Sequence, residues 1–151
     1  MRLVRPVLAA ALVLLALPLP AAAQNITLSV SPSSFTYPSA NPDSSPVVTS
    51  PQLTITYKLS GWPGLPWTIS VRAQTDMLSG SSSIPAGNVS WTATPAPFVN
   101  GTLSTTAQTL AQGIGNVTTT RHGYLTFSLQ NLWSYPNGIY SHLIVFTFSA
   151  Q

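Results

Sequence analysis

Hydrophobic and polar residues alternate along several short runs of the chain, and this period of two predicts β-strands. Clusters of Pro, Gly, Ser and Asn, which are typical of turns, separate the runs. The predicted strands are residues 26–30, 53–59, 67–73, 89–93, 108–112, 125–129 and 139–149. Most runs have one apolar face and one hydroxyl-rich face, so we expect two antiparallel sheets stacked face to face. Seven strands in this length predict an immunoglobulin-like β-sandwich.

The last run, residues 139–149, is apolar on both faces and free of Pro and Gly. Its apolar residues are Tyr140, Ile144, Phe146 and Phe148 on one face and Ile139, Leu143 and Val145 on the other. Asn137-Gly138 predicts a hairpin turn, so we expect this run to pair with residues 125–129. An unpaired edge here would promote aggregation. We therefore expect the first strand of the same chain to cover the other edge; the alternative is a strand from a neighbouring subunit. This topology would place the two ends of the mature chain at opposite ends of the sandwich.

The first 23 residues have the pattern of a secretory signal peptide. Arg2 and Arg5 precede the apolar run 7–19, and Ala21-Ala22-Ala23 fits the small-residue rule for cleavage. An uncleaved membrane anchor is the alternative, but the run is shorter than the roughly 20 residues that span a bilayer. The sequence thus predicts one domain, residues 24–151, that is extracellular, periplasmic or on the cell surface, with no transmembrane segment in the mature chain.

Charge is scarce in the predicted mature chain. Its charged residues are three cations, Lys58, Arg72 and Arg121, and two anions, Asp43 and Asp76. The net charge is therefore +1, and there is no basic patch. Nucleic acid is therefore not an expected partner. The chain has no cysteine, so core burial and sheet hydrogen bonds must stabilise it without disulfides.

Acid–base groups are too few to predict an enzyme. The mature chain has two aspartates, two histidines and no glutamate, and neither a nucleophile elbow nor a metal-ligand spacing occurs. Asp43 and Asp76 are the only carboxylate pair that could hydrolyse a glycoside, and both lie in predicted loops. His122 is expected to be a solvated loop residue and His142 a rim residue. We expect no catalytic residue, cofactor or metal.

Aromatic residues in loops are the candidate contacts for a ligand or partner. In an immunoglobulin-like topology the segments 61–67, 94–102 and 131–138 share one end of the sandwich, which would gather Trp62, Phe98, Trp133 and Tyr135. Such an aromatic pole could stack on carbohydrate or bind a protein, or it could cap the core. Four sequons for N-glycosylation also occur, at Asn25, Asn88, Asn100 and Asn116.

The C-terminal third, "GYLTFSLQNLWSYPNGIYSHLIVFTFSAQ", resembles small secreted bacterial proteins of the spore coat protein U and pilin-like type. The shared features are a strand, a P-x-G-x-Y turn and a final alternating strand. The resemblance implies an immunoglobulin-like sandwich, export, and assembly by strand exchange between subunits. Many of those domains carry cysteines. Classical chaperone–usher pilins also lack the last strand and borrow it, whereas residues 139–149 are expected to form it here.

These features favour a secreted, non-enzymatic structural or surface-associated protein, which could be a subunit of an extracellular or coat- or pilus-like assembly. The alternative is a carbohydrate- or protein-binding module that uses the aromatic pole. Self-association through the terminal strands is the expected mode of contact in the first case.

Overall fold

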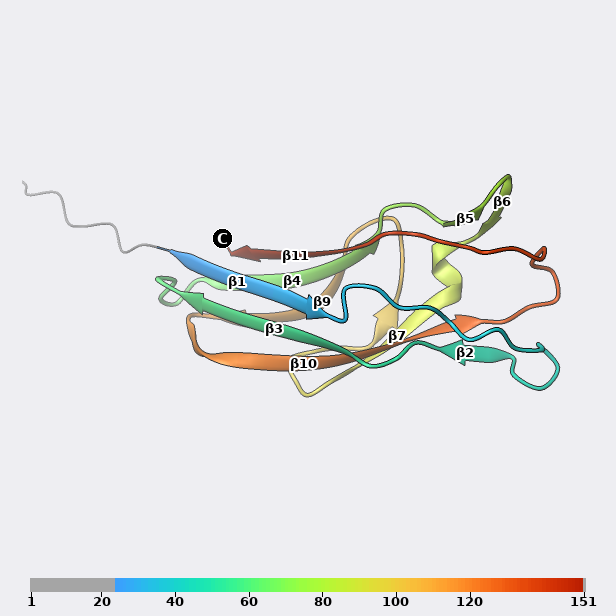
Figure 1. The fold of residues 1–151 in the computed structure, drawn as a ribbon. Helices are drawn as coiled ribbons and strands as arrows, with labels where there is room; N and C mark the ends of the chain where they lie inside the picture. The colour runs from blue at the N-terminus through green and yellow to red at the C-terminus, as the bar shows by residue number, and fades with distance from the viewer. Residues whose placement is uncertain (1–23, 151) are drawn as a thin grey trace, which may run out of the picture.

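Antiparallel strands form two stacked sheets in this chain (Figure 1), whose structure is a computed structural model that describes residues 24–150. The first sheet has the order β1-β3-β10-β7-β8, with β2 paired to β10, and the second has the order β11-β4-β9. A separate hairpin joins β5 to β6, and the 3-10 helix η1 follows it. The elements are β1 (Asn25–Ser31), β2 (Val47–Thr49), β3 (Leu53–Ser60), β4 (Pro66–Ala73), β5 (Met77–Ser79), β6 (Ser82–Ile84), η1 (Ala86–Asn88), β7 (Val89–Thr94), β8 (Gly101–Thr102), β9 (Gln108–Ile114), β10 (Val117–Gln130) and β11 (Ile144–Ala150).

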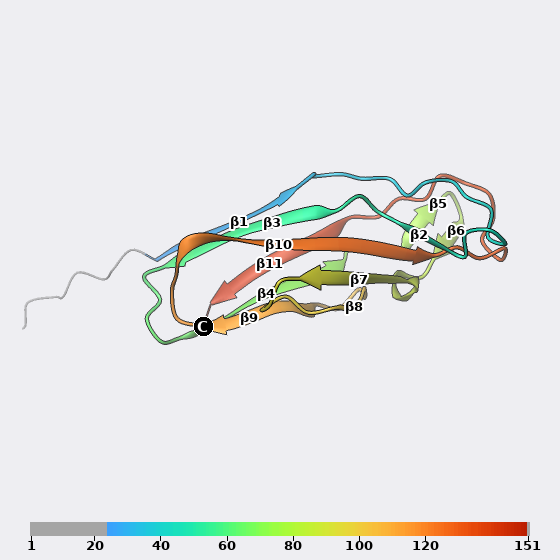
Figure 2. The ribbon, with the colours of Figure 1, turned by 90° about the horizontal axis from the view of Figure 1, so that it is seen from below.

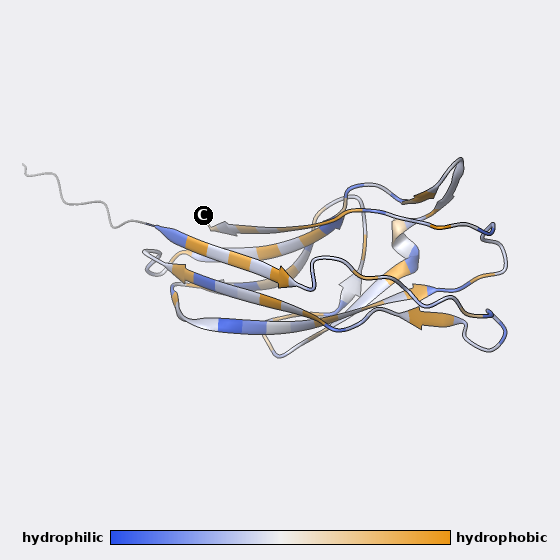
Figure 3. Cartoon of the chain, in the orientation of Figure 1, coloured by the Kyte–Doolittle hydropathy of each residue, from blue (hydrophilic) through white to orange (hydrophobic). Residues whose placement is uncertain are grey.

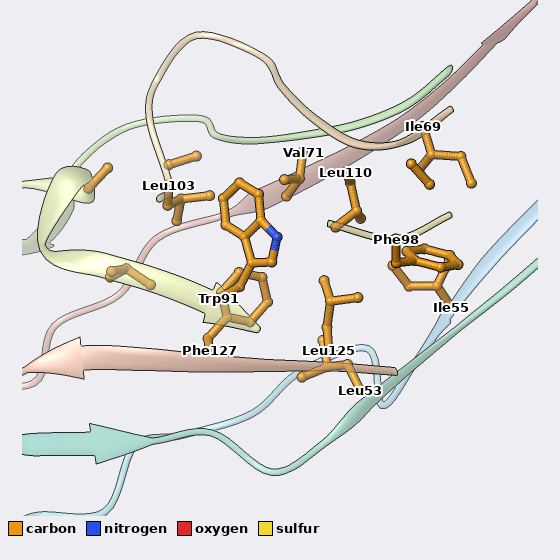
Figure 4. Packing of buried hydrophobic residues seen from close by; sticks show 14 of the residues in the cluster. Leu53, Ile55, Ile69, Val71, Trp91, Phe98, Leu103, Leu110, Leu125 and Phe127 are labelled. Atoms are coloured by element: carbon orange, nitrogen blue, oxygen red, sulfur yellow. The ribbon is translucent and has the colours of Figure 1, made fainter. Parts of the chain in front are cut away.

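The core lies between the two sheets. Alternate residues of β3 and β4 point into it, so that Ile55, Leu59, Ile69 and Val71 are completely buried. Figure 3 shows the same alternation of hydrophobic and hydrophilic residues along β1 and β3. In Figure 4, side chains from β3, β4, β7, β9 and β10 meet in this space, with the rings of Trp91 and Phe127 at its centre. The predicted all-β antiparallel sandwich is therefore confirmed.

The order of the strands matches most of the immunoglobulin pattern, in which strands A, B, E and D form one sheet and C, F and G the other. β1, β3, β10 and β7 take the positions of A, B, E and D, while β4 and β11 take those of C and F. β9 pairs with the other edge of β4. Within the described residues no strand occupies position G, on the far edge of β11.

The expected hairpin between the last two strands is wrong. β11 pairs with β4 along its whole length, from Ile144 opposite Ala73 to Ala150 opposite Trp67, and it lies in the other sheet from β10. Residues 131–143 cross from one sheet to the other instead of making a tight turn. The predicted strand 139–149 is correspondingly too long, because Ile139 is 93% exposed and the strand begins at Ile144.

Both described chain ends lie at the same end of the sandwich, contrary to the expectation of opposite ends. Asn25 pairs with Ser60 at the end of β3, and Ala150 pairs with Trp67 near the start of β4. A short loop joins β3 to β4, so these two pairs are neighbours, as Figure 1 shows. The reason is that β11 fills position F, which runs in the opposite direction to position G. We call this the terminal end of the sandwich and the other the distal end.

The predicted signal peptide, residues 1–23, lies outside the described residues. Among residues 24–150, no helix has the length and apolarity needed to cross a bilayer.

Candidate functional site

The far edge of β11 is an open edge of the second sheet. One edge of this strand pairs with β4, and no strand of the described chain pairs with the other. The expectation that β1 would cover this edge is wrong, because β1 pairs only with β3, in the first sheet. A row of backbone N–H and C=O groups is therefore available for pairing along β11.

The inward face of β11 is apolar but incompletely covered. Ile144, Phe146 and Phe148 stand opposite buried residues of β4, and directly opposed residues of an antiparallel pair point to the same face. Their partners on β4 are completely buried, whereas these three side chains are only half-buried. Phe148 does contact the core, with its ring centroid 5.6 Å from that of Trp67 and 6.1 Å from that of Tyr57. The inward side chains are therefore less completely buried on β11 than on β4.

The first sheet shows the same change in burial at β1. Ile26 and Leu28 stand opposite Leu59 and Tyr57, which are 0% and 3% exposed. Ile26 is nevertheless 43% exposed and Leu28 is half-buried. The outward residues of β1 are threonine and serine, as expected for a solvated face.

These two strands border the same side of the sandwich. In Figure 1, β1 and β11 run along the upper border of the molecule, one in each sheet. Figure 2, turned by 90°, shows β1 along the top and β11 crossing behind β10, so the two strands lie apart, and neither is paired to the other. We call this border the open side. It presents two apolar stripes. One consists of Ile26, which is 43% exposed, and the half-buried Leu28 and Val30 on β1; the other consists of the half-buried Ile144, Phe146, Phe148 and Ala150 on β11.

The predicted aromatic pole does not exist, because the structure distributes its four residues over three places. Trp62 lies at the terminal end, in the loop between β3 and β4, and packs half-buried against the core. Trp133 and Tyr135 lie at the distal end, in the segment that follows β10. The grouping fails because the loop after β10 lies at the opposite end from the loop between β3 and β4.

Phe98 is a core residue and not a surface contact. It is 6% exposed, and in Figure 4 it lies beside Ile55, near Ile69 and Leu110. Gly123 on β10 makes room for its ring, since a Cβ at that position would overlap the ring atoms. Phe98 is therefore unavailable for stacking on a ligand.

Trp133 and Tyr135 each make a hydrogen bond within the chain. Trp133 is 68% exposed and donates its indole N–H to an Asp43 carboxylate oxygen at 2.8 Å. The Tyr135 hydroxyl accepts a hydrogen bond of 2.7 Å from the Asn88 amide. Trp133 therefore does not cap the core, whereas Tyr135 packs half-buried against it.

The four sequon asparagines differ in whether the amide nitrogen, the atom that would carry a glycan, is engaged. Asn88 uses it to donate to Tyr135. Asn100 and Asn116 instead accept, through Oδ1, from the backbone N–H groups of Ala93 and Trp62. Asn25 is exposed at the start of β1. Glycosylation stays a prediction, for which Asn88 has the least suitable geometry.

The two carboxylates are engaged separately, and of the acid–base residues only Asp76 and His142 are neighbours by their charge interaction in the described chain. Asp43 is engaged with Trp133, and an Asp76 carboxylate oxygen accepts a hydrogen bond of 2.8 Å from the backbone N–H of Ala86. His122 Nδ1 lies 3.0 Å from the Thr56 hydroxyl on the exposed face of the first sheet. Within residues 24–150 no group of three or more potential metal ligands occurs.

Sequence reasoning named the residues of the open side but not their role. The alternation of Ile26, Leu28 and Val30 and the apolar content of residues 144–148 were both visible in the sequence. What the pattern does not record is which strand pairs with which edge. Comparisons of the sequence with protein-family models and with curated proteins found no match.

Proposed function

We propose that this protein is a secreted, non-enzymatic structural subunit of an extracellular or coat- or pilus-like assembly, and that an additional strand inserted at the open side joins it to its neighbour. The observation that carries this proposal is the incomplete burial of the inward faces of β1 and β11. Both stripes point toward the core, yet both stay half-exposed where their partners on β3 and β4 are buried.

A strand is the ligand that fits this side best. It would pair through its backbone with the free edge of β11 and place alternate apolar side chains over the stripe of β11 and the core beside it. Burying apolar surface contributes about 25 cal/mol per Å², so an alternating strand that fills the opening gains from both its backbone and its side chains. A partner without a free strand could not pair with the β11 backbone in this way.

The segment Asn25–Ser31 of another copy is the donor that we propose. It lies at the start of the predicted mature chain, and it alternates Ile26, Leu28 and Val30 with polar residues as an inserted strand requires. It also has the least buried set of inward residues in the first sheet, so its release from β3 exposes less apolar surface than release of any inner strand.

Secretion follows from the signal-like pattern of residues 1–23, and a structural role agrees with the separated carboxylates and the scarcity of acid–base groups. An exported chain with a hydroxyl-rich exterior and no cysteines suits an assembly held by backbone pairing and apolar burial.

A matched pair of variants tests the proposal. Ile26→Lys places a charge in the open side, at a residue already 43% exposed, whereas Thr27→Lys adds the same charge to the outward face of the same strand. We expect wild type and Thr27→Lys to form ordered oligomers or filaments with rising concentration, seen by light scattering and electron microscopy. Ile26→Lys should stay monomeric with an unchanged circular dichroism spectrum. Equal assembly of the two variants, or a wild type that stays monomeric at millimolar concentration, would contradict the proposal.

A further inference from the structure

We propose that a cleft beside β10, remote from the distal loops, binds a short saccharide that carries a carboxylate. The cleft has a volume of about 580 Å³, within the range of small-ligand sites. Its walls are the Pro95–Pro97 loop and the first half of β10, and Tyr57 and Trp67 line it from the sandwich interior. This inference is independent of the proposed assembly, because it uses neither the edge of β11 nor β1.

Two prolines explain why the cleft exists. β7 pairs with β10 only as far as Thr94, opposite Tyr124. Pro95 and Pro97 follow at once and have no N–H to give to a ladder. Residues 117–123 of β10 therefore pair with β3 on one edge and, in the described chain, with no strand on the other. Seven consecutive residues, 116–122, line the cleft, as expected when a cleft borders the edge of a strand and not one face.

A bulge concentrates hydroxyl groups at this edge. Val117 stands opposite Leu59 and Arg121 opposite Tyr57, so residues 118–120 share a single opposite residue, Lys58. These three residues are all threonines and all are exposed. Their hydroxyls both donate and accept, and backbone groups in a bulge are partly released from the ladder. Such a mixture of donors and acceptors suits the hydroxyl groups of a sugar.

Arg121 supplies the charge that selects for a carboxylate. It stands opposite Tyr57, so its side chain leaves the strand on the inward face, beside the cleft, and it is exposed. Both aspartates of the described chain belong to the distal half, where Asp43 is engaged with Trp133 and Asp76 with Ala86. A guanidinium group binds a carboxylate through two parallel hydrogen bonds, which gives both strength and orientation.

Trp67 closes the cleft toward the core. It is 5% exposed, it lines the cleft, and its indole N–H has no hydrogen-bond partner in the described chain. The indole nitrogen is itself buried and lies against Gly113 of β9, so a ligand in the cleft does not reach it. The rings of Trp67 and Tyr57 have centroids 5.6 Å apart and are 5% and 3% exposed. They therefore back the cleft as core residues and leave its threonines and Arg121 as the contacts for the ligand.

Calorimetric titration of the purified protein with trigalacturonic acid tests this site, with the neutral trisaccharide maltotriose as the control ligand. We expect saturable binding of the acidic ligand, weakened by salt, and at least about tenfold weaker binding of the neutral one, since a charge-assisted hydrogen bond is lost. Arg121→Ala should weaken the acidic ligand by about tenfold or more, whereas Lys58→Ala, which removes a cation from the neighbouring outward position, should not.

Thr119→Val gives a second readout that does not depend on charge, because it should weaken both saccharides while leaving the thermal unfolding unchanged. If Lys58→Ala and Arg121→Ala weaken binding of the acidic saccharide equally, the attraction is a non-specific charge effect, and the proposed site is wrong. Absence of saturable binding at millimolar ligand would overturn it as well, as would equal affinity for the neutral and acidic ligands. None of these results bears on the assembly, which Ile26→Lys tests separately.

Discussion

Trp91 is a buried core residue, whereas Trp133 is exposed in a loop. Trp91 is 2% exposed and packs edge-on against Phe127 with ring centroids 6.4 Å apart. Its indole N–H reaches the carbonyl of Val99 at 2.8 Å. Trp133 is a loop residue whose one polar contact is Asp43. The sequence separates the two, because Trp91 lies in the alternating run 89–93 and Trp133 lies in a predicted loop.

Replacing these two tryptophans should have very different effects on stability. Trp133→Ala removes an exposed ring and one hydrogen bond, so we expect a loss of about 1 kcal/mol. Trp91→Ala leaves a cavity in the core, so we expect a loss of about 3–5 kcal/mol. Urea denaturation followed by fluorescence measures both. A loss at Trp133 as large as that at Trp91 would mean that the distal loop is part of the core.

His142 makes stability depend on pH. Burial lowers the pKa of His142 below its ordinary value of 6.5, and the nearby negative charge of Asp76 partly opposes this shift. Below pH 6.5 the unfolded chain therefore binds a proton at this residue more readily than the folded chain does, so the free energy of unfolding falls as the pH is lowered. Above pH 6.5 this contribution is fully present.

Denaturation of wild type and His142→Gln at several pH values between 7.5 and 4.5 tests this assignment. We expect wild type to lose more stability than His142→Gln as the pH falls below about 6.5. His122→Gln, at an exposed residue of β10, is the control and should follow wild type. Parallel profiles for wild type and His142→Gln would show that His142 is not the group responsible.

At the scale of the elements, the sequence predicts strands better than it predicts their neighbours. The alternation in residues 53–59 and 67–73 locates β3 and β4 to within one residue at each end, because their inward positions are all apolar. β10 is longer than the predicted strand 125–129, since its polar first half, residues 117–123, has no apolar alternation to reveal it. The alternation of apolar and polar residues indicates which side chains of a strand point inward, but it does not indicate which strand lies beside it.

Amide hydrogen exchange of the free monomer should reveal the open edge. β4 and residues 124–129 of β10 have strands on both sides and should exchange slowest, whereas β11, with one free edge, should exchange faster in its unpaired amides. This reverses the expectation from sequence that the terminal strand is the most protected element. Protection of every β11 amide equal to that of β4 would mean that another segment covers this edge in the monomer.

At the scale of the whole molecule, the fold class could be read from the sequence and the candidate site could not. Alternating runs and turn residues define the sandwich, and all residues of the open side except Ala150 lie within predicted strands. The site itself arises because β11 joins β4 and leaves position G empty, a choice that depends on the path of residues 131–143 across the distal end. The same choice brings both chain ends to one end of the sandwich and scatters the predicted aromatic pole.

The central claim is that β11 accepts a strand at the open side, and amide exchange in the presence of a donor peptide tests it most directly. The peptide has the sequence of residues 24–31, and its control carries serine in place of Ile26, Leu28 and Val30. We predict that the first peptide slows exchange along residues 144–150 of the protein, and that the control peptide does not. Unchanged exchange at β11 under saturating donor peptide, or equal protection by both peptides, would contradict the claim.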